Sequence, residues 1–515
     1  MNLYSIQFVL FLIIALVCYY TVCKEKQWIC LLAANLVFYF WTGSVNMIFI
    51  LATSVSTWIG SRYFQKCTED YKKIKKDADI APEEKKRQKK IFDRRKQIFF
   101  WGVICLNFGI LGYLKYWKVL TGNTAGLLLP LGISFYTFQS IGYLIDTYNG
   151  KYESEGNFFK YLTFVSFFPQ LIQGPINRYD AMSSQISAKH TFEVERTKRA
   201  LLQIGFGTLK KYAIANLTAE MVSLLLDKPE RNYPGCIIVF GILLYSLYQY
   251  ADFSGGIDMV LGVAKLFGIE MKPNFRQPYF ATSLADFWRR WHISLGNWMR
   301  DYVFYPFALT KPIKNLGKWS NKKFGKHIGR VLPAALGNIL VFFLVGLWHG
   351  AQWNYILWGL YNGIVIAASD FLAPVYAWLN EKLHIPVESK IFHLFRIART
   401  FLIVNIGWYF DRIESMDNLW RSVRNTLFYF DIHRFNSVRV SVFVNIPPRT
   451  YIIVALAGLI VLINSILCEC QKDTYEILHN RNIVLRWGVY LIMIVLIWMS
   501  FTCTSITGGF MYANF

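Results

Sequence analysis

Charged residues are scarce in this chain of 515 residues. Asp, Glu, Lys and Arg together make up 17% of it, and 54% of its residues are hydrophobic. A soluble protein carries about 25% charged residues, so this composition argues against a soluble enzyme. Strand-like alternation is also missing, because the apolar segments are continuous runs. Such runs favour membrane-crossing helices over a β-barrel.

The apolar runs predict an all-α polytopic membrane protein. Several of them reach the roughly 20 residues that a helix needs to cross a bilayer. We expect about ten to twelve transmembrane helices, with further interfacial or re-entrant helices, around a central tunnel. The clearest runs are Leu3–Val22, Ile98–Trp117, Ala125–Ile145, Pro333–Trp348, Tyr355–Ser369, Tyr451–Cys468 and Trp487–Cys503.

Linkers rich in Pro, Gly or Ser are lacking, and so are repeats of fixed period. We therefore expect residues 1–515 to form a single integral membrane domain. The first apolar run, Leu3–Val22, has no basic residue before it and no small-residue cleavage site after it. It is expected to be a retained helix rather than a signal peptide.

Several familiar site patterns are absent as well. The chain has no Walker P-loop, no HExxH, no G-x-S-x-G elbow and no strand–GxGxxG–helix unit, which weakens pumps, metalloproteases, ordinary hydrolases and dinucleotide enzymes. Its nine cysteines have the spacing of neither a disulfide framework nor a zinc site. We expect them to be small apolar fillers, and we expect no metal and no bound cofactor.

Acidic residues are outnumbered by basic residues, and the formal net charge is +23. Arg62–Lys96 contains 14 Lys/Arg and 7 Asp/Glu, and Lys311–Arg330 contains seven Lys/Arg and no acid. Basic loops between membrane helices follow the positive-inside rule. We expect cytoplasmic loops at about 62–97 and 311–330, in contact with anionic lipids rather than nucleic acid. From a cytoplasmic Arg62–Lys96, the pair of apolar segments Trp28–Trp41 and Met47–Gly60 returns the chain to the same side of the membrane. Leu3–Val22 then crosses once, so Met1 is expected outside.

Acidic residues are absent between Asp301 and Asp370, where His349 follows a long apolar run in VGLWHGAQWNYILWGLYNG. An ionisable side chain inside a membrane segment is a functional candidate, because burying it costs free energy. Asn338 and His349 share one helical face, since their separation is about three turns. Gly350 is expected to end the helix directly after His349, where a tunnel or pocket could open. A histidine that hydrogen-bonds a backbone carbonyl is the structural alternative.

A second candidate, His292, lies in LADFWRRWHISLGNWMRDYVF. Large apolar residues recur there every three or four positions, which predicts one amphipathic helix with an aromatic stripe at the membrane interface. The stripe consists of Phe287, Trp291, Leu295, Trp298 and Tyr302. Asp286 is placed to pair with Arg289 or Arg290 one turn later. A purely structural role for His292 is the alternative.

Two carboxylates, Asp252 and Asp258, interrupt the apolar region that begins at Pro234. Gly255 and Gly256 lie between them, so we expect the helix to break or kink there and to line a cavity walled by protein. The alternative is that each carboxylate pairs with a basic residue and pins two helices together.

The blocks DFWRRWHISLGNWMRDY and GLWHGAQWNYILWG together resemble the membrane-bound O-acyltransferase superfamily, most closely its bacterial branch of the alginate O-acetyltransferase type. The recognisable blocks cover Pro130–Gly363. The resemblance implies a catalytic histidine at His349 and a second characteristic histidine at His292. Further substrate or tunnel candidates are Asp252, Asp258, Arg289, Arg290, Asn338, Trp348 and Trp353.

This resemblance implies a multi-pass acyltransferase of the bacterial cytoplasmic (inner) membrane. It would move an acyl group, most simply acetyl, from a cytoplasmic thioester such as acetyl-CoA toward hydroxyls of an exported or cell-surface polysaccharide, with an extracytoplasmic partner. His349 would act as general base or carry the acyl group transiently, and His292 would position groups or relay a proton. Val303–Lys311 and Asn362-Gly363 depart from the pattern of alginate-acting members, which leaves the polysaccharide open.

Three alternatives stay open beside this interpretation. The first is D-alanyl transfer to teichoic acid by a member of the same superfamily. The second is a transporter or flippase that uses Asp252, Asp258 and His349 as a proton relay. The third is a structural subunit of a polysaccharide export machine. Release of a thiol from a thioester donor would distinguish an acyltransferase from the other two classes.

Overall fold

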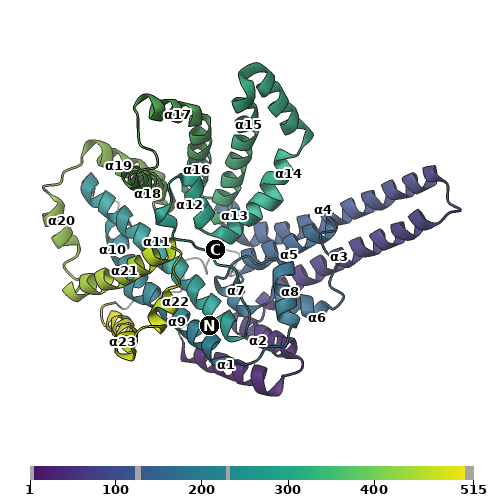
Figure 1. Cartoon of the computed structure of the whole chain (residues 1–515), viewed down its shortest axis with the longest axis horizontal. Coiled ribbons are helices and arrows are strands. Elements are labelled where there is room, and N and C mark those ends of the chain that lie inside the picture. The colour runs from purple at the N-terminus through teal and green to yellow at the C-terminus, as the bar shows by residue number, and fades with distance from the viewer. Residues whose placement is uncertain (1–4, 122–128, 228–231, 505–515) are drawn as a thin grey trace. The chain divides into compact units, whose positions relative to one another are not determined.

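The computed structural model describes residues 5–121, 129–227 and 232–504. These residues form helices joined by turns, and they contain no β-strand (Figure 1). The predicted all-α class is confirmed. The start of the run Ala125–Ile145 and the position of Met1 lie outside the described residues.

Two compact units make up the chain. The first comprises Met1–Leu201 and Val260–Lys272, and the second comprises Leu202–Met259 and Pro273–Phe510 within their described residues. The single domain expected for residues 1–515 stays a prediction.

The first unit is built around a long antiparallel helix pair, α3 and α4, against which α5 packs (Figure 1). The turn before α3 contains Gly43, whose φ is 140°. The helices are α1 (Ile6–Val17), a π-helical stretch (Cys18–Val22), α2 (Gln27–Thr42), α3 (Asn46–Lys76), α4 (Pro82–Thr121), α5 (Ile133–Tyr148), α6 (Phe158–Val165), α7 (Phe168–Ile172), α8 (Tyr179–Ser187) and α9 (Val194–Leu209), which continues into the second unit.

The basic segment Arg62–Lys96 is not an irregular loop. It forms the ends of α3 and α4, and only residues 77–81 connect the two helices. Lys76 closes α3, and Glu83 and Glu84 open α4, so each end carries charge that complements the helix dipole. These charges stabilise the helix ends, so the segment is mostly helical, and its cytoplasmic position stays a prediction.

The second unit contains the predicted site. Its helices are α10 (Leu217–Leu226), α11 (Gly235–Leu266, with its last turns in the first unit), α12 (Leu284–Arg290), α13 (Ile293–Met299), α14 (Tyr305–Ala308), α15 (Lys311–His349), α16 (Trp353–Phe371), α17 (Ala373–Lys382), α18 (Lys390–Arg412), α19 (Met416–Phe428), α20 (Phe435–Val442), α21 (Pro448–Glu469), α22 (Thr474–His479) and α23 (Ile483–Ser500). Shorter stretches are π-helical (Lys210–Asn216, Arg300–Phe304) or 3-10 (Pro278–Phe280).

Helices α15 and α16 make the most extensive helix–helix contact among the described residues of this unit. Glycines allow their backbones to approach. A Cβ added at Gly346 would lie 2.4 Å from the Tyr355 carbonyl oxygen, and one at Gly359 would lie 2.3 Å from that of Phe342. The pair therefore holds His349, at the end of α15, against the first turns of α16.

The second basic segment, Lys311–Arg330, is also helical rather than a loop. The chain reverses at Gly325, whose φ of 87° suits glycine. The two arms then pack on each other, because a Cβ at Gly329 would lie 2.4 Å from the Cβ of Asn321. The second arm continues to His349, and Gly350 follows the last helical residue, as predicted.

Six described helices are long and apolar enough to cross a membrane, namely α4, α11, α15, α18, α21 and α23. The pair α16 and α17, bent by 52°, brings the number to seven if it forms one span. Residues 6–22 and α2 form shorter apolar helices. The multi-pass membrane character is confirmed, whereas ten to twelve crossings and a central tunnel stay predictions.

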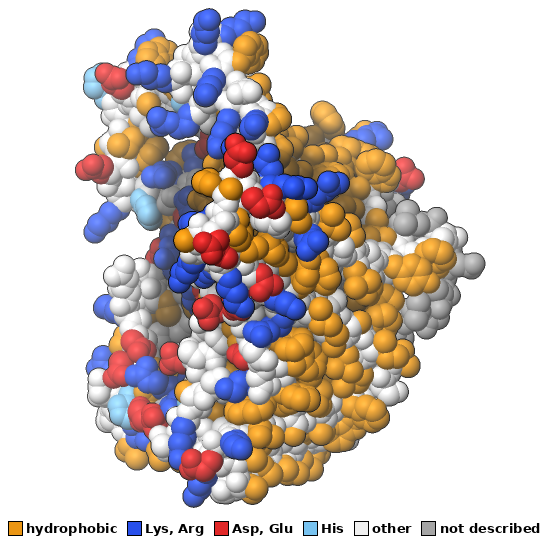
Figure 2. Space-filling view, turned by 90° about the vertical axis from the view of Figure 1, so that its right-hand side faces the viewer, with side chains coloured by type: hydrophobic (Ala, Val, Ile, Leu, Met, Phe, Trp, Pro, Cys, Tyr) orange, Lys and Arg blue, Asp and Glu red, His pale blue; other side chains and the backbone are white. Residues whose placement is uncertain are grey.

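Large apolar side chains are exposed on these spans. Trp101 on α4 is 55% exposed and Ile494 on α23 is 58% exposed. Figure 2 shows hydrophobic side chains covering a broad part of the face it draws, beside a region where charged side chains gather. Continuous apolar surface of this kind requires an apolar environment, which a bilayer supplies.

Candidate functional site

The segment that carries His292 is broken at that residue. Helix α12 ends at Arg290, α13 begins at Ile293, and His292 has φ 47° and ψ 52°, in the left-handed region. The prediction of one continuous amphipathic helix was therefore wrong. Left-handed backbone costs a non-glycine residue about 1–2 kcal/mol, so other contacts must hold it.

Those contacts come from the irregular segment before α12. The Ile293 N–H donates to the Asn274 carbonyl oxygen, and the Arg276 N–H donates to that of Arg290, both at 3.0 Å. These bonds satisfy backbone groups that a continuous helix would have paired internally. The break is thus specified by residues 274–276, outside the helical pattern itself.

The aromatic stripe faces the interior of the unit. Four of its five members are at most 4% exposed, and Tyr302 is half-buried. Trp291 lies against Phe287, Phe275 and Trp408, with ring centroids 5.1–5.6 Å apart. The break turns the rings toward the core of the unit, and the position of this segment at the membrane interface stays a prediction.

His292 is 4% exposed and is held in one orientation. The Asn274 side-chain oxygen accepts from the Ser294 N–H at 2.8 Å, so the amide nitrogen of Asn274 faces His292 Nδ1, at 3.1 Å. Nδ1 then accepts, and the ring proton is on Nε2. Burial lowers the pKa of His292 to about 3, so the ring is neutral at physiological pH.

His349 is 6% exposed and is surrounded by rings. Its ring centroid lies 4.9 Å from that of Trp348, 4.9 Å from that of Trp358 and 5.9 Å from that of Tyr355. Because Tyr355 and Trp358 belong to α16, the α15–α16 pair builds this environment. Aromatic walls keep bulk water from the imidazole.

Trp348 connects the two histidines. Its ring centroid lies 6.0 Å from that of His292 and 4.9 Å from that of His349. The two imidazoles are therefore at most about 11 Å apart, which is the sum of these distances. The structure brings together three residues that the sequence singled out from two separate blocks.

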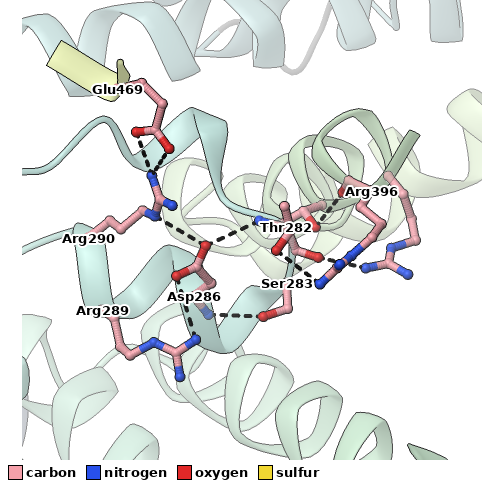
Figure 3. Close-up of polar contacts among 9 residues, drawn as sticks. Thr282, Ser283, Asp286, Arg289, Arg290, Arg396 and Glu469 are labelled. Atoms are coloured by element: carbon pink, nitrogen blue, oxygen red, sulfur yellow. Dashed lines mark hydrogen bonds and ion pairs between the residues drawn. The ribbon is translucent and has the colours of Figure 1, made fainter. Parts of the chain in front are cut away.

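Arg290 links α12 to α21 (Figure 3). Its side chain is 12% exposed, lies 3.1 Å from Asp286 and makes two bonds of 2.8 and 2.9 Å to Glu469. Asp286 also lies 3.5 Å from Arg289, whose side chain is 69% exposed. The predicted pairing of Asp286 is confirmed for both arginines. Arg290 is thus held between two carboxylates, whereas Arg289 stays accessible.

Two further arginines come from α18. Arg396 donates to the Thr282 hydroxyl at 3.1 Å, and Arg399 donates to the Thr282 carbonyl oxygen at 2.8 Å. Figure 3 shows Arg396 on the other side of Asp286 from Arg290. Four guanidinium groups thus lie with two carboxylates around the start of α12, and an anion would be attracted there.

Asp252 and Asp258 make ion pairs. The Asp252 carboxylate lies 2.5 Å from the Lys211 ammonium and that of Asp258 lies 2.6 Å from Lys210. The alternative in which the carboxylates pin helices is the one the structure supports. Whether either group also contacts a substrate stays a prediction.

Helix α11 runs through Gly255 without the expected break. Gly255 instead allows close packing, since a Cβ there would lie 2.9 Å from the Gly207 carbonyl oxygen, and one at Gly207 would lie 2.5 Å from that of Gly255. The glycine pair brings the lysines of the π-helical stretch within reach of α11.

Asn338 and Trp353 lie apart from the ring cluster. Asn338 is half-buried and precedes His349 by about 16 Å along α15. Trp353 is 68% exposed at the start of α16. No described group of three His, Cys, Asp or Glu residues is arranged to hold a metal ion, and all nine cysteines are free thiols.

Sequence reasoning missed several residues of the site: Asn274, Arg396, Trp358 and Glu469. Asn274 opens NFRQPYF, close before the histidine block, and Glu469 is an isolated acid at the end of an apolar run. Both positions could therefore be noticed in the sequence alone. Their partners lie 18 and 179 residues away, however, and no local pattern pairs them.

Comparisons with known proteins identify relatives of this chain. The model of the membrane-bound O-acyltransferase family matches residues 153–320. A probable alginate O-acetylase of Azotobacter vinelandii is 33% identical over 297 residues, which is 57% of this chain and 53% of that protein. A peptidoglycan O-acetyltransferase of Helicobacter pylori is 31% identical over 348 residues, 61% of each chain.

A teichoic acid D-alanyltransferase of Bacillus subtilis is 30% identical over 288 residues, which is 55% of this chain and 68% of that protein. The matches span about half the length of the alginate O-acetylases. The D-alanyltransferase, in contrast, is matched over more than two thirds of its length, and the family model covers the His292 block. This chain belongs to the membrane-bound O-acyltransferase family.

Proposed function

We propose that the protein is a membrane acyltransferase that moves an acyl group, acetyl in the simplest case, from a cytoplasmic thioester to a hydroxyl of an exported polysaccharide. The observation that carries this proposal is the placement of His292 and His349 on one buried indole, Trp348. The names of three relatives, which mention alginate, peptidoglycan and teichoic acid, support a glycan acceptor. An extracytoplasmic partner would complete delivery to the polymer.

His349 is proposed as the general base. It takes the proton of the acceptor hydroxyl while the oxygen attacks the thioester carbonyl carbon. The tetrahedral intermediate then expels the thiolate, which receives that proton, so an ester and a free thiol result. Transient attachment of the acyl group to His349 remains the alternative route. The rings around His349 support either route, because excluded water cannot hydrolyse the thioester.

His292 is proposed as a neutral positioning group. Its Nε2–H can donate to a carbonyl oxygen and stabilise the negative charge that develops there. The Asn274 amide supports this role, because it holds the tautomer that puts the proton on Nε2. Since the ring stays uncharged, a second positive charge next to His349 is avoided.

The arginines around α12 are proposed to contact the donor. Acyl thioesters such as acetyl-CoA carry phosphates, which guanidinium groups bind well. Trp288, next to Arg289, donates to Asn362 at 3.0 Å and lies against Phe342. Phe342 precedes His349 by about 10 Å along α15. A donor bound at Arg289 would therefore have only a short distance between its binding site and His349.

Lys311–Arg330 fits a topological role better than donor binding. Arg330 precedes His349 by about 28 Å along the second arm of α15. That length approaches the roughly 30 Å hydrocarbon thickness of a bilayer. If the basic segment lies at the cytoplasmic surface, His349 lies toward the opposite side, where an exported acceptor would arrive. The proposal includes a tunnel that connects the cytoplasmic surface with the side on which His349 lies.

Two other functions are D-alanyl transfer and proton relay, and the contacts of the site bear on both. D-alanyl transfer to teichoic acid uses the same chemistry, and the Bacillus subtilis relative supports it. A proton relay through Asp252 and Asp258 is disfavoured, because each carboxylate lies within 2.6 Å of a buried lysine. Such pairs resist the changes of charge that a relay requires.

Thiol release in detergent tests the proposal. Purified protein should release thiol from acetyl-CoA when a hydroxyl acceptor is added, and a deletion strain should lose O-acetyl groups from a surface glycan, as measured by mass spectrometry. Release from a D-alanyl thioester alone would favour teichoic acid. Neither release, together with an unchanged glycan, would exclude the acyltransferase and favour a transporter or structural subunit.

A further inference from the structure

A groove of about 520 Å³ runs along α3 in the first unit. It is lined by Trp58, Ile59, Arg62, Tyr63, Gln65, Lys66 and Glu69. Aromatic and aliphatic side chains thus lie next to two cations one helical turn apart. This combination is typical of protein surfaces at the membrane–water interface.

The groove is held in shape by the loop after α5. The Trp58 indole donates to the Glu155 carbonyl oxygen at 2.8 Å, and Gln65 accepts from the Ser154 N–H at 2.9 Å. Arg62 donates to the Ser154 hydroxyl at 3.3 Å. The side chains at its rim are therefore anchored rather than free on a helix surface.

Both helices of the long pair change from apolar to charged at the level of this groove. On α3 the change begins at Arg62, and on α4 it lies between Lys96 and Ile98. The two levels coincide, because the Tyr63 and Phe99 rings are 4.8 Å apart and Lys96 donates to Thr68 at 3.4 Å. The membrane surface is expected at this height.

Arg62 and Lys66 are exposed, and neither makes an ion pair with any residue that the structure describes. The lining carboxylate, Glu69, accepts instead from Gln65 at 2.7 Å. Toward the apolar end of α3, Val55 and Ile59 are 40% and 45% exposed one turn apart. The exposed cations Arg62 and Lys66 thus lie at one end of an exposed apolar stripe formed by Val55 and Ile59.

We propose that this groove binds an anionic phospholipid such as phosphatidylglycerol, with its phosphate at Arg62 and Lys66 and an acyl chain along Val55 and Ile59. Charge complementarity selects an anion, and the apolar stripe selects a lipid over a free phosphate or an acidic peptide. The groove belongs to the first unit and the proposed chemistry to the second, and the lipid would stabilise α3 and α4 at the membrane surface.

Binding of short-chain lipids to the full chain in a neutral detergent tests this site. Dioctanoyl phosphatidylglycerol should bind more tightly than dioctanoyl phosphatidylcholine. The double variant Arg62→Gln/Lys66→Gln should weaken phosphatidylglycerol binding about 25-fold, since each charge near anionic lipid contributes about fivefold. The matched variant Lys72→Gln/Lys75→Gln, which removes two exposed charges farther along α3, should change it less than threefold.

Equal losses in the two double variants would overturn the proposal, because general net charge would then explain binding. Inorganic phosphate or a tetraglutamate peptide that displaces phosphatidylglycerol at comparable concentration would also overturn it, in favour of a free-anion or peptide site. Unchanged thermal unfolding of both variants in detergent without added lipid keeps folding defects out of the comparison.

Discussion

At the scale of single residues, the two histidines differ in what their surroundings allow. His349 closes a helix and is walled by Trp348, Trp358 and Tyr355. His292 is fixed by Asn274 in one tautomer and is kept neutral by burial. These surroundings are the basis of the two proposed tasks, proton transfer for His349 and positioning for His292.

Replacing His349 with Ala should reduce acyl transfer on the order of 10²–10⁴-fold if it acts as general base. The protein should still accumulate in the membrane, because His349 ends a helix and no carboxylate lies near it in sequence. O-acetyl content of the surface glycan and thiol release are the measurements, and His393→Ala, at an exposed histidine on α18, is the control. Near-normal acylation in His349→Ala would refute the catalytic role.

The His292 pKa predicts a pH dependence of stability. In the unfolded chain its pKa is about 6.5, whereas burial lowers it to about 3 in the fold. Between these values only the unfolded state binds the proton, so stability is complete above about pH 6.5 and falls as the pH drops toward 3. Each pH unit costs up to about 1.4 kcal/mol.

Unfolding midpoints in detergent at pH 7, 6 and 5 measure this slope. His292→Gln should show a shallower decline than the wild type over the same range. Carboxylates contribute equally to both proteins, so the difference isolates the imidazole. Identical slopes would show that His292 is already accessible to protons in the folded state.

At the scale of elements, separate helices hold the site together through buried charge. Lys211 on the π-helical stretch pairs with Asp252 on α11, and their side chains are 4% and 0% exposed. Arg290 joins α12 to α21, and Arg396 joins the preceding loop to α18. These bonds set where α12 and His292 lie.

Removing one partner of the buried pair should destabilise the protein strongly. Lys211→Met should lower the free energy of unfolding by about 3–5 kcal/mol, because it leaves Asp252 charged and buried. The double variant Lys211→Met/Asp252→Leu should recover much of this loss. Lys189→Met, at the exposed pair with Glu25, should cost less than about 1 kcal/mol. Thermal unfolding in detergent gives all three values, and equal effects of Lys211→Met and Lys189→Met would contradict the ranking.

The arginines of α18 predict a change in donor binding. Arg399→Gln should raise the KM for acetyl-CoA about tenfold, because a hydrogen bond to a charged group contributes about 1.5–3 kcal/mol. It should also weaken the salt dependence of KM, while kcat stays close to that of the wild type. Lys390→Gln removes a charge from the first turn of the same helix and should leave KM unchanged. The donor contact is excluded if both variants behave alike.

At the scale of the whole molecule, the two basic hairpins predict the orientation in the membrane. Cysteines introduced at Ala78 and Lys322, in the α3–α4 connection and near the reversal of α15, should resist a membrane-impermeant maleimide in intact cells. Permeabilised cells should label both positions. Labelling of either position from outside would reverse the assignment and place His349 toward the cytoplasm.

The sequence by itself determined the membrane class, the helical fold and the end of α15 after His349. These features depend on local quantities: apolar runs long enough to span a bilayer and a glycine after the last helical residue. The same local reasoning found His292 and Trp348, because both lie in distinctive blocks of the sequence.

Only the tertiary structure decided how these residues meet. The break at His292 depends on Asn274 and Arg276, and the pairing of Asp252 depends on Lys211, 41 residues away. The periodicity of the His292 block alone predicts a straight helix, since hydrogen bonds from another segment leave no trace in it. The carboxylates of α11 likewise predict a cavity when only the sequence is considered. In the structure, the close contact between Gly207 and Gly255 brings the two lysines to these carboxylates. Polar groups in an apolar interior must find partners wherever the chain supplies them, and those partners are set by packing between helices.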